Sequence, residues 1–304
     1  MPLDAFVNTF AGGTLDRGGD ARNEPAWVEA RLADPSALAA VLWEGRAMIA
    51  GEALARVPLA MALAAAGDRW AFLGFEGERP LFAVELEGPA DPAEGPFAGR
   101  GGFTDMRSAA ALLPGEEAAV AGLAKSLFDW RRRHGFCSAC GQESRNACAG
   151  WKRVCPACRT EHFPRVDPVA IMLPVQGERC LLGRQHGWPE GRMSALAGFI
   201  EPGESIEEGC ARELLEEAGL RARRVIYHSS QPWPFPSSLM IGLIAQVEPG
   251  EAAPDEAELE EVQWFTREEA RAVVRGEHPQ IKAPPPFAIA AQLLKAWAED
   301  GFGD

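Results

Sequence analysis

The residues of this chain best suited to chemistry are glutamates that recur at fixed distances between Gly198 and Leu220. The stretch GFIEPGESIEEGCARELLEEAGL fits the spacing G-x5-E-x7-R-E-U-x-E-E-x-G-U, in which U is aliphatic, at every specified position. A serine is a common first residue of a helix and a glycine a common stop, so residues 205–218 are predicted to form one helix that ends at Gly219.

Three of these carboxylates are predicted to share one face of that helix. Glu213, Glu216 and Glu217 stand at i, i+3 and i+4, where helical side chains are neighbours. Like charges this close repel unless a cation lies among them, and oxygen-only ligands suit Mg²⁺ or Mn²⁺ better than zinc. A solvated acidic helix face is the alternative, but nine specified positions, two glycines and an Arg-Glu pair among them, favour metal binding. Arg212 would hold the cluster in place.

Four cysteines form a second candidate metal site. Two C-x2-C pairs, in FCSACG and VCPACR, supply Cys137, Cys140, Cys155 and Cys158, with fourteen residues between the pairs. Such pairs can close a tetrahedral zinc site, although the interval is one short of the usual ~15–20 residues. A redox dithiol normally needs only one pair at a strand-to-helix turn. Because four thiolates leave no open coordination position, the zinc is predicted to be structural.

Composition limits the partners. The chain has 304 residues with 44 acidic and 30 basic side chains, a formal charge of −14, so it has no basic field for bulk nucleic acid. No apolar run reaches about 18 residues, and the N-terminus lacks the basic start and apolar core of a signal peptide. We therefore expect a cytoplasmic protein without a membrane contact.

Alternating patterns divide the chain into three expected domains. Residues 1–130 read as an N-terminal mixed α/β domain, with strands within 40–51, 69–77 and 80–86 and a helix over 116–134. Residues 131–162 form the zinc ribbon, and residues 163–304 a C-terminal domain. In that last domain we expect a buried strand over 167–175 with an antiparallel neighbour at 179–185, further strands after the 205–218 helix, and helices over 268–275 and 287–299.

A proline-rich stretch, SQPWPFPSSLM at 230–240, narrows the function. Each proline removes a sheet donor, so this segment cannot be a central strand. Trp233 and Phe235 would therefore be displayed on a stiff loop, suited to stacking on a base or a nicotinamide ring, while Gln231 and Ser238 offer hydrogen bonds. A packed loop without a ligand is the alternative.

The glutamate stretch resembles the Nudix box. The cysteine pairs, the box and SQPWPFP, in this order, resemble the NADH pyrophosphatase family of Nudix hydrolases from about Trp130 to the last helix; residues 1–130 resemble it only in position and size. The resemblance implies an α+β fold class: a C-terminal Nudix α/β/α sandwich with a mixed sheet, preceded by a four-cysteine zinc ribbon and the N-terminal α/β domain. It also implies a homodimer in which the neighbouring subunit contributes to the pocket.

The activity implied by the resemblance is metal-dependent hydrolysis of the pyrophosphate of NAD(H) to nicotinamide mononucleotide and AMP. The same bond occurs in NAD-capped RNA, so cap removal is a second implied activity. A basic strip at Arg131–His134, with Lys152, Arg153, Arg159 and Arg165, is the concentrated candidate for RNA contact. Two rivals stay open: another Nudix substrate such as ADP-ribose or a diadenosine polyphosphate, and a non-catalytic nucleotide sensor, against which the intact box glutamates speak.

The resemblance also assigns roles to residues. The catalytic set is Glu213, Glu216, Glu217 and Arg212, with Glu217 or Glu216 orienting or deprotonating the attacking water. The Mg²⁺ or Mn²⁺ ligands are the same three glutamates with Glu258 and the backbone carbonyl of Ala197. Phe163 stands where the family usually has tyrosine, which removes a hydroxyl from the pocket. The substrate-binding set is Phe163, Phe199, Gln231, Pro232, Trp233, Pro234, Phe235, Pro236, Ser237, Ser238 and Ala290.

Overall fold

A computed structural model of the chain describes residues 8–302. These residues divide into two compact units. An N-terminal unit holds residues 9–166 together with 232–237, and a C-terminal unit holds Asn8, 167–231 and 238–302. The first seven residues of the predicted first domain and the last two of the predicted third domain lie outside the described residues.

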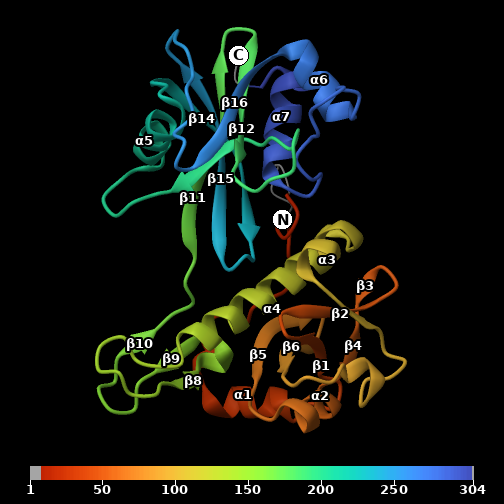
Figure 1. Cartoon of the computed structure of the whole chain (residues 1–304). Coiled ribbons are helices and arrows are strands. Elements are labelled where there is room, and N and C mark those ends of the chain that lie inside the picture. The colour runs from red at the N-terminus through yellow and green to blue at the C-terminus, as the bar shows by residue number, and fades with distance from the viewer. Residues whose placement is uncertain (1–7, 303–304) are drawn as a thin grey trace. The chain divides into compact units, whose positions relative to one another are not determined.

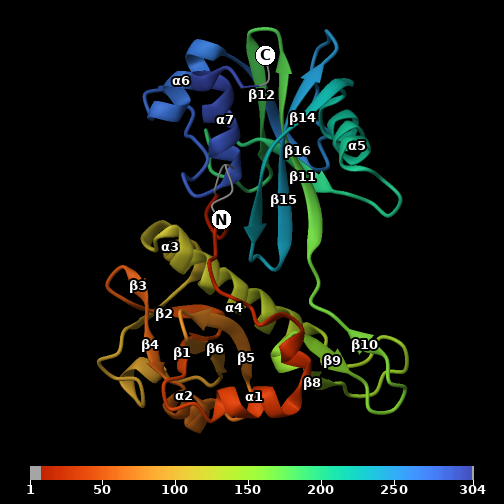
Figure 2. The same ribbon diagram turned by 180° about the vertical axis from the view of Figure 1, so that it is seen from behind.

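The N-terminal unit is built on a seven-stranded sheet with the main order β3-β2-β1-β6-β5. Strand β1 runs parallel to β6 and antiparallel to β2 and β4, so the sheet is mixed. Helix α4 lies along one face of the sheet, and α1 and α2 lie on the other (Figures 1 and 2). The strands are β1 (Leu38–Trp43), β2 (Arg46–Ala50), β3 (Ala53–Leu54), β4 (Arg56–Pro58), β5 (Trp70–Glu76), β6 (Arg79–Leu86) and β7 (Gly102–Thr104). The helices are α1 (Pro25–Leu32), α2 (Leu59–Ala66), α3 (Met106–Leu112) and α4 (Gly115–Arg133).

A small three-stranded sheet follows α4 in the same unit. Its strands are β8 (Arg145–Ala147), β9 (Lys152–Val154) and β10 (Glu161–His162), in the order β10-β9-β8. Between β8 and β9 the indole nitrogen of Trp151 donates to the carbonyl of Phe72 on β5 over 2.6 Å. This contact ties the ribbon to the first sheet.

The C-terminal unit has a six-stranded sheet with the main order β14-β15-β11-β12-β16, and β13 pairs with β11. Strand β11 runs parallel to β15 and antiparallel to β12 and β13, so this sheet is mixed as predicted. The strands are β11 (Asp167–Gln176), β12 (Arg179–Gln185), β13 (Leu196–Phe199), β14 (Ala222–Trp233), β15 (Ser238–Val247) and β16 (Leu259–Thr266).

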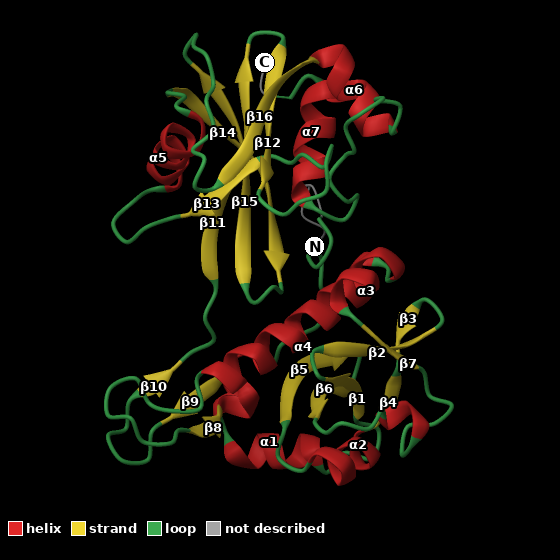
Figure 3. Cartoon of the chain, in the orientation of Figure 1, coloured by secondary structure: helices red, strands yellow, loops and turns green. Residues whose placement is uncertain are grey.

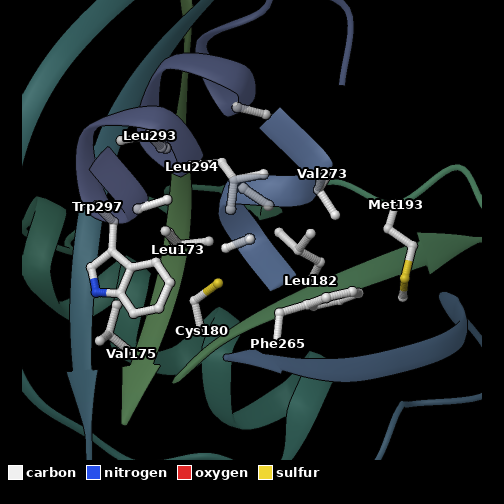
Figure 4. Packing of buried hydrophobic residues seen from close by; sticks show 14 of the residues in the cluster. Leu173, Val175, Cys180, Leu182, Met193, Phe265, Val273, Leu293, Leu294 and Trp297 are labelled. Atoms are coloured by element: carbon white, nitrogen blue, oxygen red, sulfur yellow. The ribbon is translucent and has the colours of Figure 1, made fainter. Parts of the chain in front are cut away.

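Helices cover both faces of this second sheet (Figure 3). Helix α5 (Ile206–Ala218) buries Cys210 and Leu214 against one face. Helices α6 (Arg267–Arg275) and α7 (Ile289–Asp300) pack on the other face, where Trp297, Phe265 and Leu173 lie in one fully buried core (Figure 4). The predicted α+β class and the α/β/α sandwich are confirmed.

Most predicted elements of the C-terminal unit lie within two residues of their expected bounds. The predicted antiparallel partner of β11 is β12, with Val175 opposite Cys180. The SQPW segment is the end of β14, which is compatible with a proline because β14 lies at the edge of the sheet. Among residues 8–302, no helix is long and apolar enough to cross a membrane.

Candidate active site

Helix α5 is fixed at both ends by local interactions that the sequence encodes. At its start, the Ser205 hydroxyl accepts from the Glu208 amide over 3.2 Å and the Glu208 carboxylate accepts from the Ser205 amide over 2.8 Å, a capping box. At its end, Gly219 adopts the left-handed conformation with φ 68°. Local residues therefore fix where α5 begins and ends.

Glu213 lies directly against the backbone of β13. A β-carbon on Gly198 would stand only 1.8 Å from the carboxyl carbon of Glu213, so only glycine leaves room for this side chain. Glu213 is 9% exposed, and burial raises the pKa of its carboxyl. The box glycine and the box glutamate thus form one packed pair.

Glu217 lies one turn further along the same face and is 3% exposed. Burial, followed by the charges of Glu213 and Glu258, raises the pKa of its carboxyl to about 8, against a hydrogen bond from the Ala197 backbone that lowers it. The Oε2 atom of Glu217 is buried and has no hydrogen-bond partner among the described residues. A carboxylate oxygen that is buried and unpartnered calls for a cation.

Arg212 binds the loop before α5 to the helix. Its guanidinium donates to both oxygens of Glu204, over 2.6 and 2.9 Å, and to the carbonyl of Phe199 over 2.9 Å. This fork lowers the pKa of Glu204 to about 2, so Glu204 stays ionised at neutral pH. The box spacing specifies Glu204, but sequence reasoning gave it no role; the structure makes it the main partner of Arg212.

The three box carboxylates predicted to share one face differ in burial. Glu213 and Glu217 are buried, but the Glu216 side chain is 57% exposed. Residues 216 and 217 are successive and point about 100° apart around a helix, so only one of them can follow Glu213 onto the sheet. The Nη1 atom of Arg212 donates to both Glu213 and Glu216, at 2.9 Å from each.

Glu258 comes from outside the box, one residue before β16. Its charge acts on Glu213 and Glu217 and raises the pKa of both. The charges of Glu213, Glu216, Glu217 and Glu258 therefore act on one another beside Arg212, with Glu217 Oε2 left unsatisfied. All of the side-chain donors are carboxylates, which is the donor set that Mg²⁺ and Mn²⁺ prefer, so these residues fit such an ion.

The four predicted zinc cysteines come together in the ribbon. Their sulfurs all lie within 4.8 Å of one another, and within residues 8–302 no other set of three or more His, Cys, Asp or Glu ligand atoms is as close. The Sγ atoms of Cys137 and Cys158 are 3.5 Å apart, as are those of Cys140 and Cys155. Four thiolates at this spacing fit one tetrahedral zinc ion.

Gln231 does not have the role predicted for it. Its side chain is fully buried, with Nε2 donating to the Phe287 carbonyl over 2.7 Å and Oε1 accepting from the Ile289 amide over 2.8 Å. The amide is thus used to tie β14 to the start of α7. Ala290, 3% exposed, packs in the core under α7 and offers no surface to a ligand.

The SQPWPFP aromatics are not freely displayed as predicted. Trp233 and Phe235 are half-buried, pack edge to face at 5.0 Å, and both contact Phe10. The ammonium of Lys125 on α4 donates to the Pro234 carbonyl over 2.8 Å. The loop therefore belongs to the N-terminal unit, where Pro232, Pro236 and Ser237 keep exposed or half-buried surface and Pro234 is buried; Ser238, in the C-terminal unit, is half-buried.

Two predicted stacking residues are well exposed. Phe163 in the N-terminal unit is 62% exposed, and Phe199 at the end of β13 is 60% exposed. Both remain predictions as substrate contacts.

The basic strip predicted for RNA contact is largely used within the protein. Arg131 donates to the carbonyls of Asp68 and Trp70, and Arg132 pairs with Glu85 and Asp129. Lys152 pairs with Glu161, and Arg153 is buried against Ser144. Charges already neutralised by neighbours add little to the binding of a polyanion.

Models of known families match three successive segments of the chain. An NADH pyrophosphatase-like rudimentary NUDIX domain matches residues 36–130, an NADH pyrophosphatase zinc ribbon domain matches residues 132–163, and a NUDIX domain matches residues 164–285. The first match goes beyond the sequence analysis, which related residues 1–130 to the family only by position and size. It accords with the parallel pair β1–β6, which repeats the arrangement of β11–β15.

Relatives of known name align over most of the chain. It is 45% identical over 196 residues to "NAD-capped RNA hydrolase NUDT12" of Macaca fascicularis, covering 61% of this chain and 42% of that protein. It is 41% identical over 212 residues to "NAD(P)H pyrophosphatase NUDT13, mitochondrial" of Homo sapiens, covering 66% and 60%. It is 37% identical over 241 residues to "NAD-capped RNA hydrolase NudC" of Mycobacterium bovis, covering 75% and 74%. The chain spans about half the length of the NUDT12 and NUDT13 proteins. It belongs to the NADH pyrophosphatase family of Nudix hydrolases.

Proposed function

We propose that this protein hydrolyses the pyrophosphate bond of NAD(H) to nicotinamide mononucleotide and AMP, and removes NAD caps from RNA by cleaving the same bond. One observation carries the proposal: two buried carboxylates lie next to each other on α5. Glu213 packs against Gly198, and the Oε2 atom of Glu217 has no hydrogen-bond partner. The names of the NUDT12, NUDT13 and NudC relatives support the substrate.

In this proposal the chain's own residues orient the reactants. Glu213, Glu216, Glu217 and Glu258, with the Ala197 carbonyl, would hold Mg²⁺ or Mn²⁺. When bound, the ions offset phosphate charge and lower the pKa of a water. Glu217 or Glu216 would orient or deprotonate the attacking water, and the buried Glu217 Oε2 is the atom left for the ion. Arg212 positions the carboxylates through Glu204 and Phe199.

Substrate contacts are assigned to exposed aromatic groups. The backbone carbonyl of Phe199 accepts a hydrogen bond from Arg212, so the backbone that carries the Phe199 ring is held in place beside the carboxylates. Phe163 and the rings of the 232–237 loop complete the proposed set.

The proposal includes a homodimer and a cytoplasmic location. The dimer is what the resemblance to the family implies, and Leu112, Phe136 and Val166 are exposed apolar side chains available to a partner. Support for the location comes from seven cysteines that form no disulfide, as in a reducing compartment. Light scattering during gel filtration tests the dimer, which a monomeric mass would exclude.

A substrate panel tests the reaction class. NADH, NAD, ADP-ribose, a diadenosine polyphosphate and NAD-capped RNA are compared by kcat/KM with Mn²⁺ present. We expect NADH or capped RNA to exceed ADP-ribose and the diadenosine compound by at least about tenfold, which corresponds to one well-made extra contact. Preference for ADP-ribose would replace the substrate. Tight NADH binding without turnover would make the protein a nucleotide sensor.

A further inference from the structure

His186 is an exposed residue directly after the end of β12, in the C-terminal unit. Strands β12 and β16 run antiparallel side by side (Figure 3), and their pairing ends with Gln185 opposite Leu259. His186 follows Gln185 and Glu258 precedes Leu259, so one more step of the same register sets His186 opposite Glu258. His186 therefore stands beside the segment that supplies the proposed metal ligand from outside the box.

The segment that carries Glu258 is a polar turn at the end of the loop between β15 and β16. Residues 255–258 are all exposed, so packing in a core does not set their position. The Asp255 carbonyl accepts from the amides of Glu258 and Leu259, over 3.0 and 2.8 Å. The Asp255 carboxylate accepts from the Ala257 amide over 3.0 Å. These bonds give the turn its shape, but they do not attach it to the rest of the unit.

Besides the strand pairing at Leu259, two hydrogen bonds attach the turn to its surroundings. The Asp255 amide donates to the backbone carbonyl of Glu217 on α5 over 3.0 Å. The Nε2 atom of His186 lies 2.8 Å from the carbonyl oxygen of Glu256. A carbonyl oxygen only accepts, so Nε2 carries the hydrogen and donates it. The turn is thus held by α5 through one bond and by the end of β12 through the other.

The position of this turn decides where the Glu258 carboxylate lies relative to the carboxylates of α5. Besides burial, which is the main cause, the charge of Glu258 raises the pKa of the Glu213 and Glu217 carboxyls, so the three groups are close enough to interact. An exposed segment that is held by few hydrogen bonds opens at a small cost in free energy. Loss of one of these bonds therefore lets Glu258 move away from Glu213 and Glu217.

We propose that His186 is a positioning residue of the divalent-metal site: its Nε2–H group holds the Glu256 carbonyl and so keeps the Glu258 carboxylate beside those of α5. His186 does not ligate the ion in this role, because Nε2 is engaged with the carbonyl. The inference rests on the proposed function, since it concerns the ion that the carboxylates would hold. It predicts that a change at His186 lowers the affinity for metal and leaves the substrate contacts intact.

A double-mutant cycle on Mn²⁺ affinity tests this role. Mn²⁺ is titrated by electron paramagnetic resonance, without substrate, into the unsubstituted protein, His186→Ala, Glu258→Ala and the double variant. We expect each single variant to bind Mn²⁺ about tenfold more weakly, because groups that orient a metal ligand affect affinity by about 10- to 100-fold. The double variant should be no weaker than Glu258→Ala, because His186 acts through Glu258. Additive losses of about 100-fold in the double variant, or an unchanged affinity in either single variant, overturn the inference.

Two further variants separate the hydrogen bond from other effects of the substitution. Gln185→Ala changes the exposed, uncharged residue directly before His186 and should leave Mn²⁺ affinity unchanged. His186→Gln keeps a side-chain N–H donor and should restore most of the affinity that His186→Ala loses. A glutamine variant as weak as the alanine variant overturns the inference, since the donor would not then be the cause. Thermal melting in EDTA establishes that each variant is folded.

Hydrogen exchange in the metal-free protein distinguishes this inference from the proposed function. Exchange of the Glu258 and Leu259 amides, followed in EDTA by mass spectrometry, measures how often the turn opens. His186→Ala should exchange these amides about tenfold faster than Gln185→Ala, and equal rates overturn the inference. Neither this rate nor Mn²⁺ affinity depends on turnover. A protein that does not hydrolyse NADH would contradict the proposed function, while both tests of His186 would still decide this inference.

Discussion

Replacing Glu217 with glutamine is expected to stabilise the metal-free protein at neutral pH while it removes activity. The pKa of the Glu217 carboxyl is about 8 in the fold, above the ordinary value of 4.5. The folded state therefore keeps a proton that the unfolded state releases between these values. The contribution of Glu217 to the stability of the metal-free protein is therefore fully present below pH 4.5 and is lost as the pH rises toward 8.

The size of the effect follows from this linkage. Between pH 4.5 and pH 7 the pH rises by about 2.5 units, and each unit lowers the folding stability by about 1.4 kcal/mol. At pH 7 the loss is therefore roughly 3 kcal/mol. Glutamine has the shape of the protonated carboxyl and does not titrate, so Glu217→Gln avoids this cost. The variant gains stability because it carries no charge at this buried position. Its kcat falls about 100-fold or more because the base is lost.

Differential scanning calorimetry in EDTA, at pH 5 and pH 7, measures the difference. We expect Glu217→Gln to melt above the unsubstituted protein at pH 7 and close to it at pH 5. Saturating Mn²⁺ should remove most of this difference, because an ion at 100 times its Kd adds about 2.7 kcal/mol only where it binds. Glu207→Gln, an exposed carboxylate of the same helix, is the control.

Two results would refute the reasoning. The first is a Glu217→Gln variant that melts below the unsubstituted protein in EDTA at pH 7. The second is a difference that is the same at pH 5 and pH 7, since titration could not then be its cause.

Three further predictions follow from the packing. Gly198→Ala should lower kcat/KM by about 100-fold, because a β-carbon there displaces the Glu213 carboxylate, whereas Gly135→Ala, with nothing within 4 Å, should leave kinetics unchanged. Gln231→Ala should cost about 2–4 kcal/mol in urea unfolding with KM for NADH unchanged, because it removes two buried hydrogen bonds, one to the Phe287 carbonyl and one from the Ile289 amide; a raised KM at unchanged stability would return Gln231 to the substrate site. Cys155→Ser should abolish the binding of one zinc per chain and lower the melting temperature without making kcat dependent on added zinc, measured by a colorimetric zinc assay, and zinc retained in full would remove Cys155 from the ligand set.

The sequence predicts best what local interactions decide. The start and end of α5 were predictable because Ser205, Glu208 and Gly219 act within a few residues of one another. The cysteine pairs were predictable because each C-x2-C is a turn that needs little from the rest of the chain. The strand β13 has four residues, too few for a periodic pattern, and it was not predicted.

The errors in the candidate site come from long-range contacts. Gln231 is buried by a partner 56 residues away, and the 232–237 loop is held by Lys125, 109 residues from Pro234. Neither partner can be identified from a pattern in the neighbouring sequence. The separation of Glu216 from the buried pair is a different case, because helical geometry alone distinguishes i+3 from i+4 once the direction of the sheet is known.

The most direct test of the central claim is the identity of the bond that breaks. NADH is incubated with the protein, with and without Mn²⁺, and the products are identified and quantified by mass spectrometry. We expect reduced nicotinamide mononucleotide and AMP in equal amounts, formed only with the divalent ion and lost in Glu217→Gln. Intact NADH in the presence of Mn²⁺, or release of free nicotinamide, would contradict it.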